Sequence, residues 1–246
     1  MPDPTPNPAD IINEPAPSRR PQWLQMLPRP RAHWNFRYLS ARLALAAFYR
    51  RRPDAPWLAQ GMVEFLSGYL LPGDTLVEFG SGRSTLWFAR KVTPSGRIIS
   101  IEHHHAWHTQ ITALLRTENI RNVDYRHTPE DAPSYLAAAA AALAAAPSPS
   151  SPAAPKADII LVDGIHREKC VLWALDHIKP GGAIILDNAN WFIPNPPVPT
   201  HSPPKFGTHP QSQRPEWATF VAATQGWRRY WTTNDISDTA AYFAPI

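Results

Sequence analysis

A glycine-rich turn between a short apolar run and a helix-like stretch is the part of this chain best suited to hold a small charged ligand. The apolar run covers 75–79, the helix is predicted over 84–92, and the candidate binding residues are Glu78, Gly80, Ser81, Gly82 and Ser84. Glycines carry no Cβ, so the backbone can approach a ligand closely, and a helix N-terminus favours anionic groups. Glu78 is unusual beside a phosphate and suits a ligand with a positive charge, such as an amino group. The turn therefore predicts a nucleotide-sized site.

Three further strand-like runs end in side chains that carry oxygen. The runs are 97–102, 157–163 and 182–187, and their terminal polar residues are Glu102, Asp163, Asp187 and the following Asn188. An acid such as Glu102, about 20 residues beyond a glycine turn, can accept hydrogen bonds from both hydroxyls of a ribose. Ligands of open α/β sheets bind at the carboxyl ends of strands. Two carboxylates and an amide oxygen there suit a hard cation such as Mg2+.

The elements that must position these residues alternate between strand and helix, which predicts a parallel sheet covered on both faces. Strands are predicted over 75–79, 97–102, 122–126, 157–163 and 182–187, and helices over 84–92, 105–118, 131–146, 166–178 and 215–225. Two helices, 38–51 and 56–70, precede this core, and two strands, 227–232 and 239–244, end the chain. The fold class is therefore α/β and doubly wound.

The four motif segments, in this order, resemble the class I S-adenosylmethionine-dependent methyltransferases. The E-x-G-x-G turn, the acid that ends the second strand and the K-P-G-G turn before the fifth strand all match, and the resemblance covers roughly 71–190. It implies a Rossmann-like, seven-stranded, mostly parallel sheet with an antiparallel C-terminal hairpin. It also implies S-adenosylmethionine as the cofactor.

A dinucleotide-binding dehydrogenase is the competing interpretation of the turn. Its fingerprint needs a third glycine where this chain has Thr85, so helix and strand would pack less closely. A glycine turn without a ligand would leave Glu78 and Glu102 unexplained.

The resemblance also assigns roles around the cofactor. The residues it implies are Glu78, Gly80, Ser81, Gly82, Ser84, Glu102, His103, Glu130, Asp131 and Asp163. His103 would lie beside the adenine, and Glu130 or Asp131 would contact the adenine amino group. A helix N-cap is the alternative for this acidic pair, and both roles can hold at once.

Similarity to catechol O-methyltransferase and related small-molecule O-methyltransferases implies a magnesium site formed by Asp163, Asp187 and Asn188. The segment Asp163-Gly164-Ile165-His166 resembles the D-G-x-H motif of sugar and macrolide O-methyltransferases. His166 would be the general base, with Asp163 also catalytic, in methyl transfer to a hydroxyl of a small molecule. Alternatively, the acids only cap turns and His166 only begins a helix. The function would then be metal-independent transfer to another acceptor, or binding of S-adenosylmethionine without catalysis.

The whole chain of 246 residues fits one α/β domain with additions. We expect a disordered proline-rich arm over 1–30, a cap of helices over 31–70, and the methyltransferase domain over 71–246. Within that domain lie a low-complexity insert, 137–156, and a proline-rich loop, 191–215. A net charge of +4 with scattered arginines argues against a nucleic-acid partner. No apolar stretch approaches the ~20 residues that span a membrane. We expect a cytoplasmic protein, because the apolar segment that an export signal needs does not follow Ser18-Arg19-Arg20.

Overall fold

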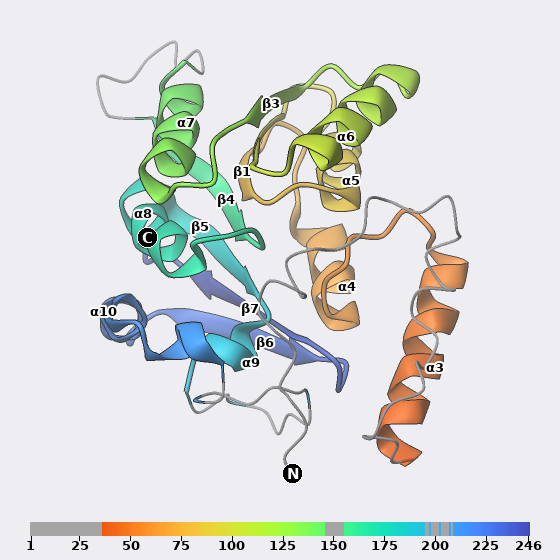
Figure 1. Cartoon of the computed structure of the whole chain (residues 1–246), viewed down its shortest axis with the longest axis vertical. Coiled ribbons are helices and arrows are strands. Elements are labelled where there is room, and N and C mark those ends of the chain that lie inside the picture. The colour runs from red at the N-terminus through yellow and green to blue at the C-terminus, as the bar shows by residue number, and fades with distance from the viewer. Residues whose placement is uncertain (1–35, 146–154, 195–196, 198–201, 203–206, 208) are drawn as a thin grey trace.

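The computed structural model describes residues 36–145, 155–194, 197, 202, 207 and 209–246 (Figure 1). The expected arm, 1–30, lies outside the described residues, as do parts of the expected insert, 137–156, and of the expected loop, 191–215.

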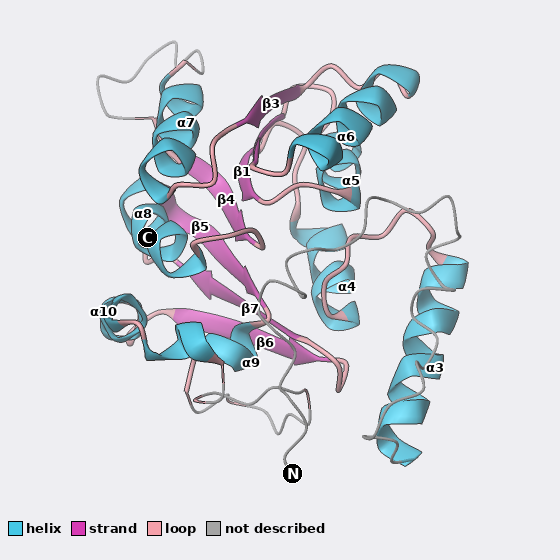
Figure 2. Ribbon diagram, viewed as in Figure 1, coloured by secondary structure: helices cyan, strands magenta, loops and turns pink. Residues whose placement is uncertain are grey.

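A seven-stranded sheet forms the centre of the molecule (Figure 2). Its strands are β1 (Thr75–Phe79), β2 (Arg97–Glu102), β3 (Val123–His127), β4 (Ala157–Val162), β5 (Ile178–Asp187), β6 (Arg228–Thr233) and β7 (Asp238–Phe243), in the order β3-β2-β1-β4-β5-β7-β6. The first five strands run parallel, and β7 pairs antiparallel with both β5 and β6. The predicted mostly parallel sheet with an antiparallel C-terminal hairpin is confirmed.

Helices cover both faces of this sheet. They are α3 (Phe36–Arg51), α4 (Gln60–Tyr69), α5 (Arg83–Lys91), α6 (His105–Thr117), α7 (Ala132–Ala144), α8 (Arg167–His177), α9 (Ala189–Phe192) and α10 (Pro215–Ala223), with a 3-10 helix at Pro210–Gln213. Side chains of α7, α8 and α10 share one buried cluster with one face of the strands, whereas α3, α4 and α5 share another with the opposite face. Strand residues alternate between the two clusters, as the pleat requires. No helix in the described ranges has the length and apolar character needed to cross a bilayer.

Several boundaries differ from those expected, and α4, for example, begins at Gln60 and not at residue 56. β5 begins at Ile178, four residues before the predicted start, because Ile178 pairs with Ala157 of β4 before a register shift. The helix α7 contains most of the alanine run, and Ala139 and Ala142 are fully buried there. Their small side chains let α7 lie close to the sheet, so this part of the expected insert belongs to the core.

Candidate active site

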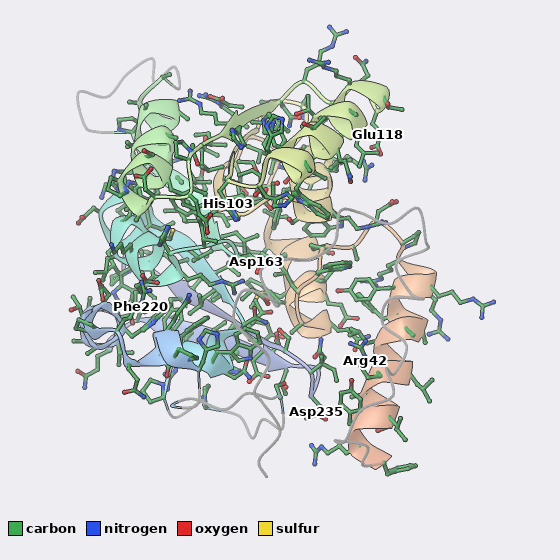
Figure 3. The ribbon with its side chains drawn as sticks, in the orientation of Figure 1. Arg42, His103, Glu118, Asp163, Phe220 and Asp235 are labelled. Atoms are coloured by element: carbon green, nitrogen blue, oxygen red, sulfur yellow. The ribbon has the colours of Figure 1, made fainter. Side chains whose placement is uncertain are left out.

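A cavity of about 750 Å³ opens at the carboxyl ends of the parallel strands. Nine residues expected at the site line it: Gly80, Ser81, Gly82, Ser84, Glu102, His103, Asp163, Asp187 and Asn188. Figure 3 labels four lining residues from separate parts of the chain, which are Arg42, His103, Glu118 and Asp163. The volume is typical of sites that take cofactor-sized ligands. One continuous space therefore joins the glycine turn to the ends of β4 and β5.

Two glycines let the loops after β1 and β4 touch at the floor of this cavity. Gly80 has a φ of 92°, and a Cβ there would lie 2.7 Å from the amide nitrogen of Gly164. A Cβ on Gly164 would lie 2.4 Å from the hydroxyl of Tyr135. Real Cβ atoms do not approach other atoms so closely, so both positions require glycine in this packing.

Glu78 is fully buried beneath the glycine turn and is not part of the cavity lining. The hydroxyls of Thr85 and Ser100 donate to its Oε2 at 2.5 and 2.8 Å. Its Oε1 has no donor at hydrogen-bonding distance and angle among the described residues. Burial raises the pKa of Glu78 to about 7, although the side chains of Ser84, Thr85 and Ser100 act to lower it. The site thus keeps one carboxylate oxygen without a protein partner next to the turn.

Thr85 stabilises the glycine turn at the position where the dehydrogenase fingerprint has a third glycine. Its hydroxyl accepts from the backbone N–H of Gly82 at 3.0 Å and donates to Glu78. The side chain is fully buried. Thr85 thus ties the start of α5 to the end of β1.

Glu102 links the glycine turn to the start of α6. Its Oε2 accepts from the backbone N–H and the hydroxyl of Ser81 at 3.1 and 2.7 Å, and its Oε1 accepts from the backbone N–H of His104 at 2.7 Å. Nδ1 of His103 lies 3.2 Å from the same Oε1. Burial acts to raise the pKa of Glu102, but the hydrogen bonds from His103, Ser81 and His104 outweigh it and lower the pKa. Glu102 is therefore an ionised acid at the cavity wall.

The three expected metal ligands are brought together, but an arginine lies between them. Arg167 Nη2 donates to Asp163 Oδ1 at 3.0 Å, and Nη1 donates to Asn188 Oδ1 at 2.9 Å. The hydroxyl of Thr239 donates to Asp187 Oδ1 at 2.6 Å. Within the described ranges, no group of three or more His, Cys, Asp or Glu side chains could hold a metal ion. The donor set therefore does not fit a divalent cation as it stands, because Oδ1 of each of the three residues already accepts an N–H or O–H group.

Asp163 and Asp187 form a close acidic pair. Burial raises the pKa of Asp187 well above its usual range, and the charge of Asp163 raises it further. Burial also raises the pKa of Asp163, although Arg167 and Asp187 act to lower it. This arrangement favours a proton on Asp187 and a negative charge on Asp163, which faces Arg167. The side chain of Asp163 is 31% exposed, so the ionised member of the pair is open to the cavity.

Besides Glu78, three expected site residues lie away from the cavity lining. His166 has a φ of 50°, and its Nε2 lies 2.7 Å from the backbone oxygen of Glu130. Asp131 caps α7, because its Oδ1 accepts from the backbone N–H of Ser134 at 2.8 Å. Neither His166 nor the pair Glu130 and Asp131 contributes to the wall of the 750 Å³ cavity. Their roles as base and as adenine contacts stay predictions.

Two lining residues, Arg167 and His209, are absent from the sequence-based expectations. Arg167 occupies the first turn of α8, where the helix dipole disfavours a cation, and this placement was a signal for an unusual role. His209 is buried and stacks on Trp191, with ring centroids 5.1 Å apart. Its Nδ1 accepts from the backbone N–H of Gln211 at 3.2 Å, and burial together with Arg167 lowers its pKa. The proline-rich sequence around His209 gave no signal for this position.

Residues 77–189 match the model of a family described as a methyltransferase domain. That segment runs from β1 to the first residue of α9, so it contains the glycine turn and the Asp163–Asp187 pair. No curated protein sequence matches the chain.

Solved structures share the fold at low sequence identity. An O-methyltransferase from Bacillus cereus in complex with SAH is 17% identical, with a TM-score of 0.54 over 91% of this chain and 96% of that one. The O-methyltransferase TomG from Streptomyces achromogenes, involved in tomaymycin synthesis and solved with SAM, is 21% identical. Its TM-score is 0.51 over 82% of this chain and 88% of TomG. These likenesses establish a common architecture.

Proposed function

We propose that this chain, whose residues 77–189 match a methyltransferase-domain model, is a class I S-adenosylmethionine-dependent methyltransferase that moves a methyl group to a hydroxyl oxygen of a small molecule. The single observation that carries the proposal is the continuous cavity between the glycine turn and Asp163. A methyl donor at the turn and an acceptor beside Asp163 would share that space. Binding both in line removes much of the entropic barrier to the reaction.

The residues at the glycine turn fit S-adenosylmethionine. The free Oε1 of Glu78 offers a carboxylate oxygen for the amino group of the methionine moiety. The ionised Glu102 suits a ribose diol, which would replace the Ser81 hydroxyl at Oε2. When bound, S-adenosylmethionine supplies a methyl group on a positively charged sulfur.

Asp163 is the proposed proton acceptor. The proton of the acceptor hydroxyl passes to a carboxylate oxygen of Asp163 as the O–C bond to the methyl group forms and the S–C bond breaks. Asp187 keeps its own proton, and Arg167 fixes the orientation of Asp163 through Oδ1. A partly exposed carboxylate on the cavity wall is better placed for this step than His166, whose ring nitrogen meets the backbone of Glu130. Because the donor set does not fit a divalent cation, no step is assigned to magnesium.

Aromatic side chains on the acceptor side support a small, partly apolar acceptor. Trp191, Phe192 and His209 line the cavity next to Asn188, and Tyr49 and Trp57 line it from the cap. Flat aromatic faces bury apolar ligand surface and leave the orientation of the ligand to a few polar groups. The proposed substrate class is therefore a small molecule with a hydroxyl group on an aromatic or otherwise apolar frame.

The test begins with calorimetric titration of S-adenosylhomocysteine, followed by a screen of small hydroxylated acceptors. We expect binding near micromolar, about −8 kcal/mol. Absence of binding would refute the proposed cofactor. Tight binding without any acceptor that consumes S-adenosylmethionine would favour a non-catalytic binding protein.

Two variants then decide which residue accepts the proton. Asp163→Asn should retain binding of S-adenosylhomocysteine and lower kcat by about 100-fold or more, because general-base catalysis contributes that much. His166→Ala should leave kcat close to that of the wild type. The reverse outcome, with His166→Ala inactive and Asp163→Asn active, would return the role of base to His166. Both rates are read as methyl transfer to the acceptor found in the screen.

A further inference from the structure

Arg167 uses its entire guanidinium group at the junction of β4 and β5. Nε donates to the backbone oxygen of Gly164 at 2.9 Å. Nη1 donates to the backbone oxygen of Asp187 at 2.7 Å and to Asn188 Oδ1 at 2.9 Å. Nη2 donates to the backbone oxygen of Asp163 at 2.7 Å and to its Oδ1 at 3.0 Å. A guanidinium has five N–H donors, so every one of them has an acceptor here.

The five acceptors are the kinds of oxygen that bind hard cations. They comprise three backbone carbonyls, one carboxylate and one side-chain amide, and such oxygens form the ligand sets of Mg2+ and Ca2+. The Arg167 side chain is only 14% exposed, and the ring of Phe192 lies 5.9 Å from its guanidinium carbon. The charge is therefore enclosed by protein oxygens and an aromatic face.

The position of Arg167 at the N-terminus of α8 is unfavourable for a cation. Arg167 is the first residue of α8, and a helix N-terminus carries partial positive charge that disfavours a cation. The converging oxygens must therefore supply the stabilisation that holds the guanidinium there. Removal of the side chain would leave Asp163, Asn188 and three carbonyls with no partner for these lone pairs.

We propose that the Arg167 guanidinium is a built-in replacement for a divalent cation at the end of β4 and β5. It joins the two strand ends, neutralises Asp163 and orients that carboxylate toward the acceptor space. Its five donors are all occupied by protein, so Arg167 is a positioning residue. The enzyme then needs no added metal. The consequence for methyl transfer rests on the proposed function, whereas the cation replacement itself does not.

Binding of Mn2+ alone tests the replacement without any substrate. We would titrate wild type, Arg167→Ala, and the double variant Arg167→Ala with Asp163→Asn, following the loss of the free Mn2+ electron paramagnetic resonance signal. Wild type should remove no Mn2+ from solution. Arg167→Ala should gain one site, and the double variant should lose that site again. Arg97→Ala is the matched control, because Arg97 is a partly buried arginine paired with Asp124 at 2.8 Å outside the cavity.

Two results would overturn the proposal. One is binding of Mn2+ by the wild type that Asp163→Asn abolishes, and the other is a folded Arg167→Ala that gains no site. Circular dichroism reports whether Arg167→Ala is folded. If the variant is not folded, the titration of the wild type alone tests the proposal. A wild-type Mn2+ site that depends on Asp163 would contradict the replacement, and a wild type without such a site would support it.

Methyl transfer provides a separate readout. Wild-type activity should not change when a chelator is added, and Arg167→Lys should lose about 100-fold in kcat, since a single ammonium cannot hold five oxygens and Asp163 becomes misplaced. Chelator-sensitive wild-type activity that Mg2+ restores would refute the replacement. If no acceptor is ever methylated, the proposed function fails while the Mn2+ titrations still decide the role of Arg167.

Discussion

Glu78 is a buried acid whose protonation is coupled to folding. Its pKa rises from an ordinary 4.5 to about 7 because it is removed from solvent, and the hydroxyls of Thr85 and Ser100 compensate only in part. Between these two values the native state holds a proton that the unfolded state has released. The stabilising contribution is therefore fully present below pH 4.5 and is lost as the pH rises through about 7.

Glu78→Gln should remove this pH dependence. The amide stays neutral, so the free energy of unfolding of the variant, relative to wild type, should increase between pH 4.5 and about 7. The change across the window should be on the order of 3 kcal/mol, from about 1.36 kcal/mol for each pKa unit. Urea denaturation at a series of pH values measures it.

Exposed Glu64 supplies the control for that experiment. Glu64→Gln should show no comparable change relative to wild type over the same pH range. A difference between Glu78→Gln and wild type that stays constant with pH would show that Glu78 titrates normally in the folded protein.

At the scale of elements, the first turn of α8 joins the candidate active site to the last helix of the chain. Glu168 follows Arg167 directly, is fully buried, and pairs with Arg214, which precedes α10. The other carboxylate oxygen of Glu168 has no hydrogen-bond partner among the described residues. The ion pair thus fixes the position of α10, and with it the end of the segment that carries His209.

Arg214→Met should destabilise the protein by about 3 kcal/mol, because it leaves the buried charge of Glu168 without a partner. Replacing both residues, as Arg214→Met with Glu168→Met, should recover part of that loss. Chemical denaturation of the four members of this double-mutant cycle measures the coupling. Arg228→Met, at an exposed arginine of β6, is the control. Equal stabilities of Arg214→Met and wild type would show that the pair contributes nothing.

The order of elements could be predicted because its causes are local. Apolar runs that end in an acid, such as those before Glu102 and Asp187, specified the strands, and the glycine turn specified the start of α5. Contacts between distant parts of the chain were not predictable in this way. The role of Arg167 depends on acceptor oxygens at the ends of two strands, which are distant from each other in the sequence. His209 reaches the cavity from a segment without a periodic pattern. The direction of His166 depends on one left-handed backbone conformation, which neighbouring residues do not dictate.

At the scale of the whole molecule, one hydroxyl connects the N-terminal cap to the C-terminal hairpin and the active site. The backbone N–H of Ala59, just before α4, donates to Thr239 Oγ1 at 2.9 Å. The same hydroxyl donates to Asp187 Oδ1 at 2.6 Å. All three residues are buried. Segments separated by 180 positions therefore meet at a carboxyl group of the candidate site.

Thr239→Val tests whether this connection matters, because valine keeps the shape of the side chain and removes only the hydroxyl. It leaves the N–H of Ala59 without an acceptor and Asp187 Oδ1 without a donor, and each such loss costs about 1–3 kcal/mol. The variant should unfold at lower urea concentration and lose activity as Asp187 shifts against Asp163. Thr239→Ser, which keeps the hydroxyl, should recover most of both. If Thr239→Val were as stable and active as wild type, the cap would be held by apolar packing alone. The hydroxyl would then have no part in aligning the acidic pair.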